Sequence, residues 1–225
     1  MDLQQSKNEI AAIAKKMYLS GMVNIFEGNI SVRAKDRFLI TPSQQSKENM
    51  TEDMIIELDE EGKVLNPSDK YKPSSESQMH LAAYKLRSDV NAVVHNHSPY
   101  ATAFAVAGRA IKSTALTEML GIFGEIPIVP YGTPGTERIY AGFPEHLKYN
   151  YAVLLANHGV LAVGETLFKA YSIAEAVEKI AQTLLYAELL GGGKSIPEKE
   201  AEMIREHGFQ RRKKIIETAQ EAVKP

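Results

Sequence analysis

The stretch VVHNHSPY, residues 93–100, joins the end of an apolar run to the start of a helical segment. The apolar run from Asn91 to His95 predicts a strand, and side chains alternate between the two faces of a strand, so His95 and His97 share one face. Pro99 favours the first turn of a following helix. A second run, YAVLLANHGVLAV at 151–163, has the same form, with a polar break that carries His158. Together these stretches predict a buried sheet with histidines at its strand ends.

Further elements are predicted on both sides of these stretches. Ser6 and Glu9 have capping-box spacing ahead of a helix over about 6–20. NISVR and RFLIT predict two short strands joined by Ala34-Lys35-Asp36, and MIIELDEEGKVL predicts a hairpin that turns at Glu61-Gly62. The remaining helices are expected at 75–87, 166–190 and from Pro197 to about Val223.

Because no composition break marks a linker, we expect a single domain over residues 1–225, with 195–225 as a charged helical tail.

Composition excludes several classes of function. The net charge of −2 gives no electrostatic reason to expect nucleic acid or an anionic membrane as a partner. The chain has no cysteine, which excludes disulfides, thiolate metal sites and cysteine nucleophiles and fits a reducing compartment. The start MDLQQSKNEI has no signal-peptide pattern, and no apolar run approaches the roughly 20 residues of a membrane span. We therefore expect a cytoplasmic protein.

Three of the six histidines stand where apolar strands end: His95, His97 and His158. Neutral imidazole is a preferred zinc ligand, and three protein ligands with one open position is the catalytic arrangement. On spacing alone, a second interpretation stays open, in which one histidine of the 95/97 pair hydrogen-bonds within the core and the other is exposed.

A second candidate is KPSSESQMH, where Ser74, Ser75 and Glu76 precede or open a helix. Free N–H groups at a helix start favour an anion. Helix capping alone also explains these residues, and on local mechanics it is the simpler interpretation. His80, four residues after Glu76, shares its helical face and is expected to pack or support rather than to bind metal. GNIS (28–31) and TPS (41–43) add hydroxyl and amide donors but no cation.

Taken in order, six motifs resemble the class II aldolase/adducin family, most closely its L-fuculose-phosphate aldolase branch: GNISVR, LITPS, PSSE, AVVHNHS, PYGTPGT and LLANHG. The resemblance extends from the first helix to about residue 190. It implies a three-layer α/β/α fold around a mainly antiparallel sheet, assembled as a homotetramer with sites at subunit interfaces.

The resemblance also implies roles for individual residues. His95, His97 and His158 would bind one Zn²⁺ per chain, with Glu76 as catalytic acid/base and possible fourth ligand. The phosphate pocket would comprise Asn29, Ser43, Gln44, Ser74 and Ser75. The implied reaction is reversible cleavage of a ketose 1-phosphate, L-fuculose 1-phosphate or a related deoxypentulose 1-phosphate, into dihydroxyacetone phosphate and an aldehyde.

The chain departs from the family pattern on the aldehyde side. The fuculose-phosphate aldolases have a tyrosine in the segment aligned with TALTEML and another in the tail, whereas this chain has none between Tyr100 and Tyr131. Thr117 or Glu118 falls near the first position and His207 near the second, so Glu118 and His207 are candidate substrate-side residues. Gln44 stands where glycine is usual, and EGN (27–29) replaces the common GGN.

Three alternatives remain within the same resemblance. Pentulose-phosphate 4-epimerases have aspartate where Glu76 stands and a further acid that is absent here. Methylthioribulose-1-phosphate dehydratases share the glutamate and the zinc. Adducin-like modules are non-enzymatic binding proteins that have lost the metal ligands, and the presence of all three histidines argues against them.

Overall fold

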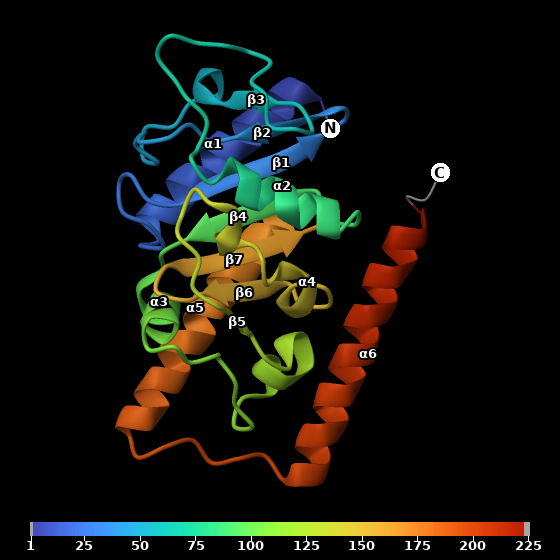
Figure 1. Cartoon of the computed structure of the whole chain (residues 1–225). Coiled ribbons are helices and arrows are strands. Elements are labelled where there is room, and N and C mark those ends of the chain that lie inside the picture. The colour runs from blue at the N-terminus through green and yellow to red at the C-terminus, as the bar shows by residue number, and fades with distance from the viewer. Residues whose placement is uncertain (1, 223–225) are drawn as a thin grey trace.

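Seven strands form the central sheet of the structure, a computed structural model that describes residues 2–222 (Figure 1). The strands are β1 (Asn29–Ala34), β2 (Arg37–Ile40), β3 (Ile56–Leu58), β4 (Ala92–Asn96), β5 (Ile128–Val129), β6 (Ala152–Leu155) and β7 (Gly159–Gly164). Their order is β3-β2-β1-β4-β7-β6-β5, and every neighbouring pair is antiparallel except β5 and β6. The prediction of a mainly antiparallel sheet is confirmed.

Helices cover both faces of this sheet. On one face lie α1 (Leu3–Leu19), α3 (Pro99–Val106) and α5 (Leu167–Leu189), and on the other lie α2 (Ser77–Leu86) and α4 (Phe143–His146). Strand residues alternate between the two hydrophobic clusters, as Val93 and Val94 of β4 show. The three-layer α/β/α architecture is therefore confirmed.

The remaining elements are short turns and the C-terminal helix. They are η1 (Glu52–Met54), η2 (Met119–Phe123, a π-helical turn), η3 (Glu137–Ile139) and α6 (Glu198–Ala222). The predicted tail helix is present, although its expected last residue, Val223, lies outside the described residues. Over residues 2–222, no helix is both long enough and apolar enough to cross a bilayer.

α6 packs against η2 through an unusually close contact. A Cβ atom added to Gly208 would lie 2.3 Å from the carbonyl oxygen of Gly121, so only glycine allows this approach. Next to it, the buried Arg212 donates from Nη1 to the carbonyl oxygen of Ile122 at 2.9 Å. The tail helix and η2 therefore form one packing unit along a side of the molecule (Figure 1).

One local prediction is wrong. The capping box at Ser6 and Glu9 is absent, because α1 already begins at Leu3 and Ser6 is buried within it, with its Oγ donating to the carbonyl of Asp2 at 3.2 Å.

The predicted hairpin after β3 is present, with a short second arm. Leu58 and Val64 form an antiparallel bridge, and the backbone N–H groups of Asp59 and Leu65 donate to the carbonyl oxygens of Lys63 and Glu57. The Asn66 side chain then bonds to the backbone of β3 and the residue before it, at Glu57 N (2.7 Å) and Ile55 O (3.0 Å).

Candidate metal centre

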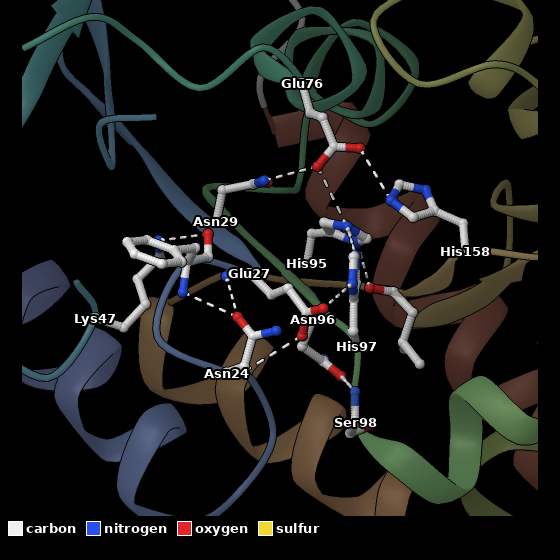
Figure 2. Close-up of polar contacts among 12 residues, drawn as sticks. Asn24, Glu27, Asn29, Lys47, Glu76, His95, Asn96, His97, Ser98 and His158 are labelled. Carbon is white, nitrogen blue, oxygen red and sulfur yellow. Dashed lines mark hydrogen bonds and ion pairs between the residues drawn. The ribbon is translucent and has the colours of Figure 1, made fainter. Parts of the chain in front are cut away.

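Three histidines converge where β4 and the turn between β6 and β7 meet (Figure 2). His95 is in β4, His97 follows its last residue, and His158 lies in the turn. The ring centroids are 4.8–4.9 Å apart in each pair. One nitrogen from each ring lies within 4.8 Å of the others. The convergence predicted from the sequence is confirmed, and the interpretation of a separate core histidine and an exposed one is wrong.

The backbone around His158 is shaped for this approach. Asn157 has a φ of +57°, in the left-handed region that asparagine tolerates better than most residues. A Cβ atom on Gly159 would lie 2.5 Å from the carbonyl oxygen of Asn96 and 2.8 Å from Cδ2 of His97. The Asn-His-Gly sequence therefore lets the turn pass directly over the end of β4.

Polar contacts at Nδ1 accompany the orientation of two of the rings toward a common point. His95 Nδ1 lies 2.8 Å from the carbonyl oxygen of Val160, which can only accept, so Nδ1 carries the proton and Nε2 is free to bind. His97 Nδ1 lies 3.5 Å from Glu27 Oε1, while its Nε2 is 3.0 Å from the Nε2 of His95. The two Nε2 lone pairs thus face the same space.

Burial keeps imidazoles of this cluster neutral. It lowers the pKa of His95 well below its usual value, and the charges of His97 and His158 lower it further. Burial also lowers the pKa of His158, against the opposing effect of the Glu76 carboxylate. Metal ions bind neutral imidazole, so these side chains are ready to act as ligands near neutral pH.

Glu76 lies over the histidines from the start of α2. Its Oε2 is 3.3 Å from His95 Nε2, and its Oε1 is 3.4 Å from His158 Nε2. Oε2 also accepts a hydrogen bond from Asn29 Nδ2 at 2.8 Å, whereas Oε1 is buried with no hydrogen-bond partner among residues 2–222. One carboxylate oxygen is therefore held in place and the other is left for a ligand.

A chain of buried polar groups holds Asn29 in turn. The register of β1 against β4 pairs Asn29 with His95. Asn29 Oδ1 lies 2.5 Å from His80 Nε2, and His80 Nδ1 lies 2.6 Å from Ser31 Oγ, which also bonds Tyr84. Because Oδ1 can only accept, His80 donates from Nε2 and accepts a hydrogen bond from the Ser31 hydroxyl at Nδ1. The prediction that His80 supports the site rather than binding metal agrees with these contacts.

This donor set fits a divalent transition metal. Three imidazoles and a carboxylate oxygen without a hydrogen bond are ligands of the kind that Zn²⁺ binds in proteins. Of the four donors, Glu76 is the one that substrate can displace without dismantling the site, because the histidines alone supply three ligands.

A cavity of about 270 Å³ adjoins the histidines and shares Glu76 and His97 with them. Its wall brings together all five residues expected to bind phosphate: Asn29, Ser43, Gln44, Ser74 and Ser75. Gln44 has a φ of +53°, which explains why glycine is usual at this position. A larger cavity, about 530 Å³, lies between α3 and the end of α5 and contains none of the histidines.

The sequence did not reveal two charged residues in this cavity wall. Lys47 is buried and Glu27 lies beside His97. The glutamate of EGN, in place of the common glycine, marked Glu27 as unusual, but the sequence did not indicate that its side chain would lie beside His97. Lys47 had no signal, because a single lysine in a polar segment is typically solvated.

The structure does not bring Glu118 or His207 to the histidines of their own chain. Glu118 is exposed and precedes η2, and His207 is exposed on α6, next to the Gly208 contact. Neither lines the cavity beside Glu76. The two residues do share one packing unit, that of η2 and α6.

Comparisons with known proteins agree with this geometry. The family profile described as the class II aldolase and adducin N-terminal domain matches residues 8–185. The chain is 36% identical over 206 residues to a 5-deoxy-D-ribulose 1-phosphate aldolase of Bacillus thuringiensis serovar kurstaki, covering 90% of this chain and 94% of that protein. It is 37% identical over 192 residues to the L-fuculose phosphate aldolase of Escherichia coli K12, covering 82% and 85%. A solved L-fuculose 1-phosphate aldolase superposes with a TM-score of 0.81 at 30% identity, covering 90% of this chain and 95% of that one.

Proposed function

The chain belongs to the class II aldolase and adducin family, and we propose on this basis that it is a zinc-dependent aldolase. It would reversibly cleave a ketose 1-phosphate, L-fuculose 1-phosphate or a related deoxypentulose 1-phosphate, into dihydroxyacetone phosphate and an aldehyde. The observation that carries this function is the position of Glu76, between the three histidines and the cavity lined by serines and amides.

In the proposed reaction, separate residues of the chain hold the metal and transfer the proton. His95, His97 and His158 would hold the metal, which when bound would supply a Lewis acid for negative charge on the substrate oxygens. As the C3–C4 bond breaks, the aldehyde carbonyl forms at C4 and its hydroxyl proton leaves to a base. The bonding electron pair passes toward C3 and the neighbouring carbonyl, and Glu76 then delivers a proton to C3. In the condensation direction Glu76 removes that proton.

Asn29 makes Glu76 suitable for this transfer. Its Nδ2 holds Oε2 at 2.8 Å, so Oε1 is the oxygen free to move the proton. The phosphate would lie against Ser43, Ser74 and Ser75, close to the start of α2, where the helix dipole favours an anion. The reacting carbon would then stand between the phosphate and the histidines.

We also propose a homotetramer whose sites lie between subunits. Its support is that Glu118 and His207, the candidates for the aldehyde side, are exposed and away from the histidines of their own chain. A cytoplasmic location follows from the substrate class, because charged phosphate esters do not cross a bilayer.

A panel of ketose 1-phosphates tests the function. With zinc-loaded protein, at least one member should release dihydroxyacetone phosphate, and chelation should abolish that release until zinc is restored. A methylthioribulose-1-phosphate dehydratase would remove water without releasing dihydroxyacetone phosphate, and a 4-epimerase would only change the stereochemistry. Either outcome, or no metal bound after reconstitution, would exclude the aldolase.

Glu76→Gln tests the proton transfer. The variant should bind about as much metal as the wild type, because three histidines remain, but its kcat should fall by about 10²- to 10⁴-fold. Metal analysis and steady-state kinetics measure the two quantities. Glu61→Gln, an exposed glutamate in the turn after β3, is the matched control. Full activity of Glu76→Gln would remove Glu76 as the acid/base.

A further inference from the structure

Lys47 is a buried ammonium group without a carboxylate partner. Its side chain is 2% exposed. Nζ donates to the carbonyl oxygen of Gln45 at 3.1 Å and approaches that of Phe26 at 3.5 Å, and no ion pair joins it to a carboxylate within residues 2–222. An ammonium has three protons to donate, and buried lysines are nearly always paired with an anion. The third proton and most of the charge are therefore uncompensated.

The position of Lys47 indicates where a compensating anion would lie. Lys47 lines the cavity beside Glu76 together with Ser43, Ser74 and Ser75, and it is the only lysine or arginine among the lining residues. The other charged side chains of the wall are the carboxylates of Glu27 and Glu76. Without Lys47, a phosphate group in this cavity would face two carboxylates and no fixed cation. Figure 2 shows Lys47 approaching from the side opposite the histidines.

We propose, resting on the function proposed above, that Lys47 is the fixed counter-charge for the phosphate group and makes the site selective for phosphorylated ketoses. The two carbonyl contacts hold the ammonium at the wall while its remaining proton and charge act on a phosphate oxygen. The neutral serines and amides then orient the phosphate, and Lys47 supplies the charge that they lack.

The protonation of Lys47 is consistent with this role. Burial without a partner lowers the pKa of Lys47 to about 8, so the ammonium form still predominates by roughly tenfold at pH 7. A phosphate dianion in the cavity would raise that pKa again, because the charged form gains a partner. Ligand binding and proton uptake at Lys47 are thus linked.

The competing explanation is that Lys47 has a structural role only, in which it holds together the two loops whose carbonyl oxygens it contacts. Lys47→Gln separates the two roles, because an amide can still donate to the Gln45 carbonyl but has no charge. Lys63→Gln, which removes one positive charge from an exposed lysine after β3, is the matched control. Each protein is compared fully zinc-loaded, by calorimetric titration with inorganic phosphate and by steady-state kinetics on the ketose 1-phosphate that the wild type cleaves.

We expect Lys47→Gln to weaken the binding of inorganic phosphate about 10-fold or more and to raise KM by a similar factor, since a hydrogen bond to a charged group is lost. Its kcat, metal content and thermal midpoint should change little, and Lys63→Gln should match the wild type throughout. Unchanged phosphate affinity in Lys47→Gln overturns the assignment. So does a loss that is matched by falls in thermal midpoint and metal content, or a wild-type protein that binds no phosphate.

The calorimetric titration needs no turnover, so it distinguishes this assignment from the proposed function. If no ketose 1-phosphate is cleaved but Lys47→Gln still weakens phosphate binding, the aldolase fails and the phosphate role of Lys47 stands. If the wild type is an aldolase and Lys47→Gln binds phosphate equally well, only the role of Lys47 fails.

Discussion

Glu27 lies at the outer edge of the histidine cluster, where its Oε1 is 3.5 Å from Nδ1 of His97. The same carboxylate accepts from the backbone N–H of Asn24 through Oε2 at 3.3 Å, and the Asn24 side chain accepts from the backbone N–H of Glu27 at 3.0 Å. This mutual bonding holds the carboxylate where it can keep the Nδ1 proton on His97. A ligand histidine whose other nitrogen is so held is a better oriented and more basic ligand.

Glu27→Gln should therefore weaken metal binding by about 10-fold, the lower end of the range for such outer partners, because the contact is long and half-exposed. Competition against a chromophoric chelator measures the dissociation constant. Glu52→Gln, the same chemical change on exposed η1, should leave it unchanged. Equal affinities in the wild type and Glu27→Gln would show that Glu27 has no part in holding the metal.

His80 should make stability depend on pH. Burial lowers the pKa of His80 to about 3, against about 6.5 in the unfolded chain. Between these values only the unfolded chain takes up the proton. The contribution of His80 is therefore intact above about pH 6.5, and it is lost progressively as pH falls toward the folded-state value.

Between about pH 7.5 and about pH 5, this single group should lower the free energy of unfolding by about 2 kcal/mol. Denaturant titration at the two pH values measures the free energy of unfolding of the wild type and of His80→Gln, with both proteins free of metal. The variant should be less stable overall but show a smaller loss on acidification. His207→Gln, which changes an exposed histidine, should keep the wild-type pH dependence. Equal pH dependence in all three proteins contradicts the expectation.

At the scale of single residues, the sequence predicted what depends on near neighbours along the chain and not what depends on contacts between distant segments. The shared face of His95 and His97 follows from the alternation of a strand, which is purely local. The partners of His80 follow from how α2 lies over β1, which no local pattern determines. The burial of Lys47 depends on loops folding around it, so its charge could not be assigned to the cavity beforehand.

Among the elements, the start of α1 was the least predictable. Ser6 and Glu9 satisfy a capping pattern, but tertiary burial of Ser6 moved the start of α1 to Leu3. The long periodic helix at 166–190 was predicted nearly to its ends, because an apolar stripe over many turns leaves few alternatives. The layer arrangement came from the family resemblance rather than from periodicity.

The contact between α6 and η2 gives a prediction at this scale. Gly208→Ala should loosen the tail helix, because the new Cβ would collide with the Gly121 carbonyl, although alanine favours a helix by about 1 kcal/mol over glycine. Gly121→Ala is the matched control, since a Cβ there meets only a methyl group of Ile204 at 3.6 Å.

Hydrogen exchange measures the loosening. Amides of α6 and η2 should exchange faster in Gly208→Ala than in the wild type, and those of Gly121→Ala should not. Slower exchange in Gly208→Ala would mean that helix propensity outweighs the close contact.

At the scale of the whole molecule, the exposed positions of Glu118 and His207 raise the question of which chain they serve. If His207 reaches the site of a neighbouring subunit, two inactive variants can complement each other. Glu76→Gln and His207→Gln should each be weakly active alone. Oligomers formed by mixing them after dissociation should regain part of the wild-type activity, because some sites then combine an intact Glu76 with an intact His207.

Activity assays on the mixed oligomers, with each variant alone as reference, measure this recovery. Mixtures no more active than the mean of their components would place His207 in its own chain's site or outside any site. A fully active His207→Gln would remove its substrate-side role altogether.

The chain from Tyr84 through Ser31, His80 and Asn29 to Glu76 has a practical consequence for changing the substrate by directed evolution. The ring centroid of Tyr84, on α2, lies 4.8 Å from that of Phe38 in the hydrophobic cluster between α2 and the sheet, and Tyr84 does not line the cavity beside Glu76. Mutations along this hydrogen-bond chain would nevertheless reorient the Glu76 carboxylate. A library that randomises these positions would therefore consist mostly of inactive clones. If the aldehyde side lies at Glu118 and His207, as proposed above, diversity is better confined to Thr117, Glu118 and the tail helix, which leaves the contacts of Glu76 unchanged.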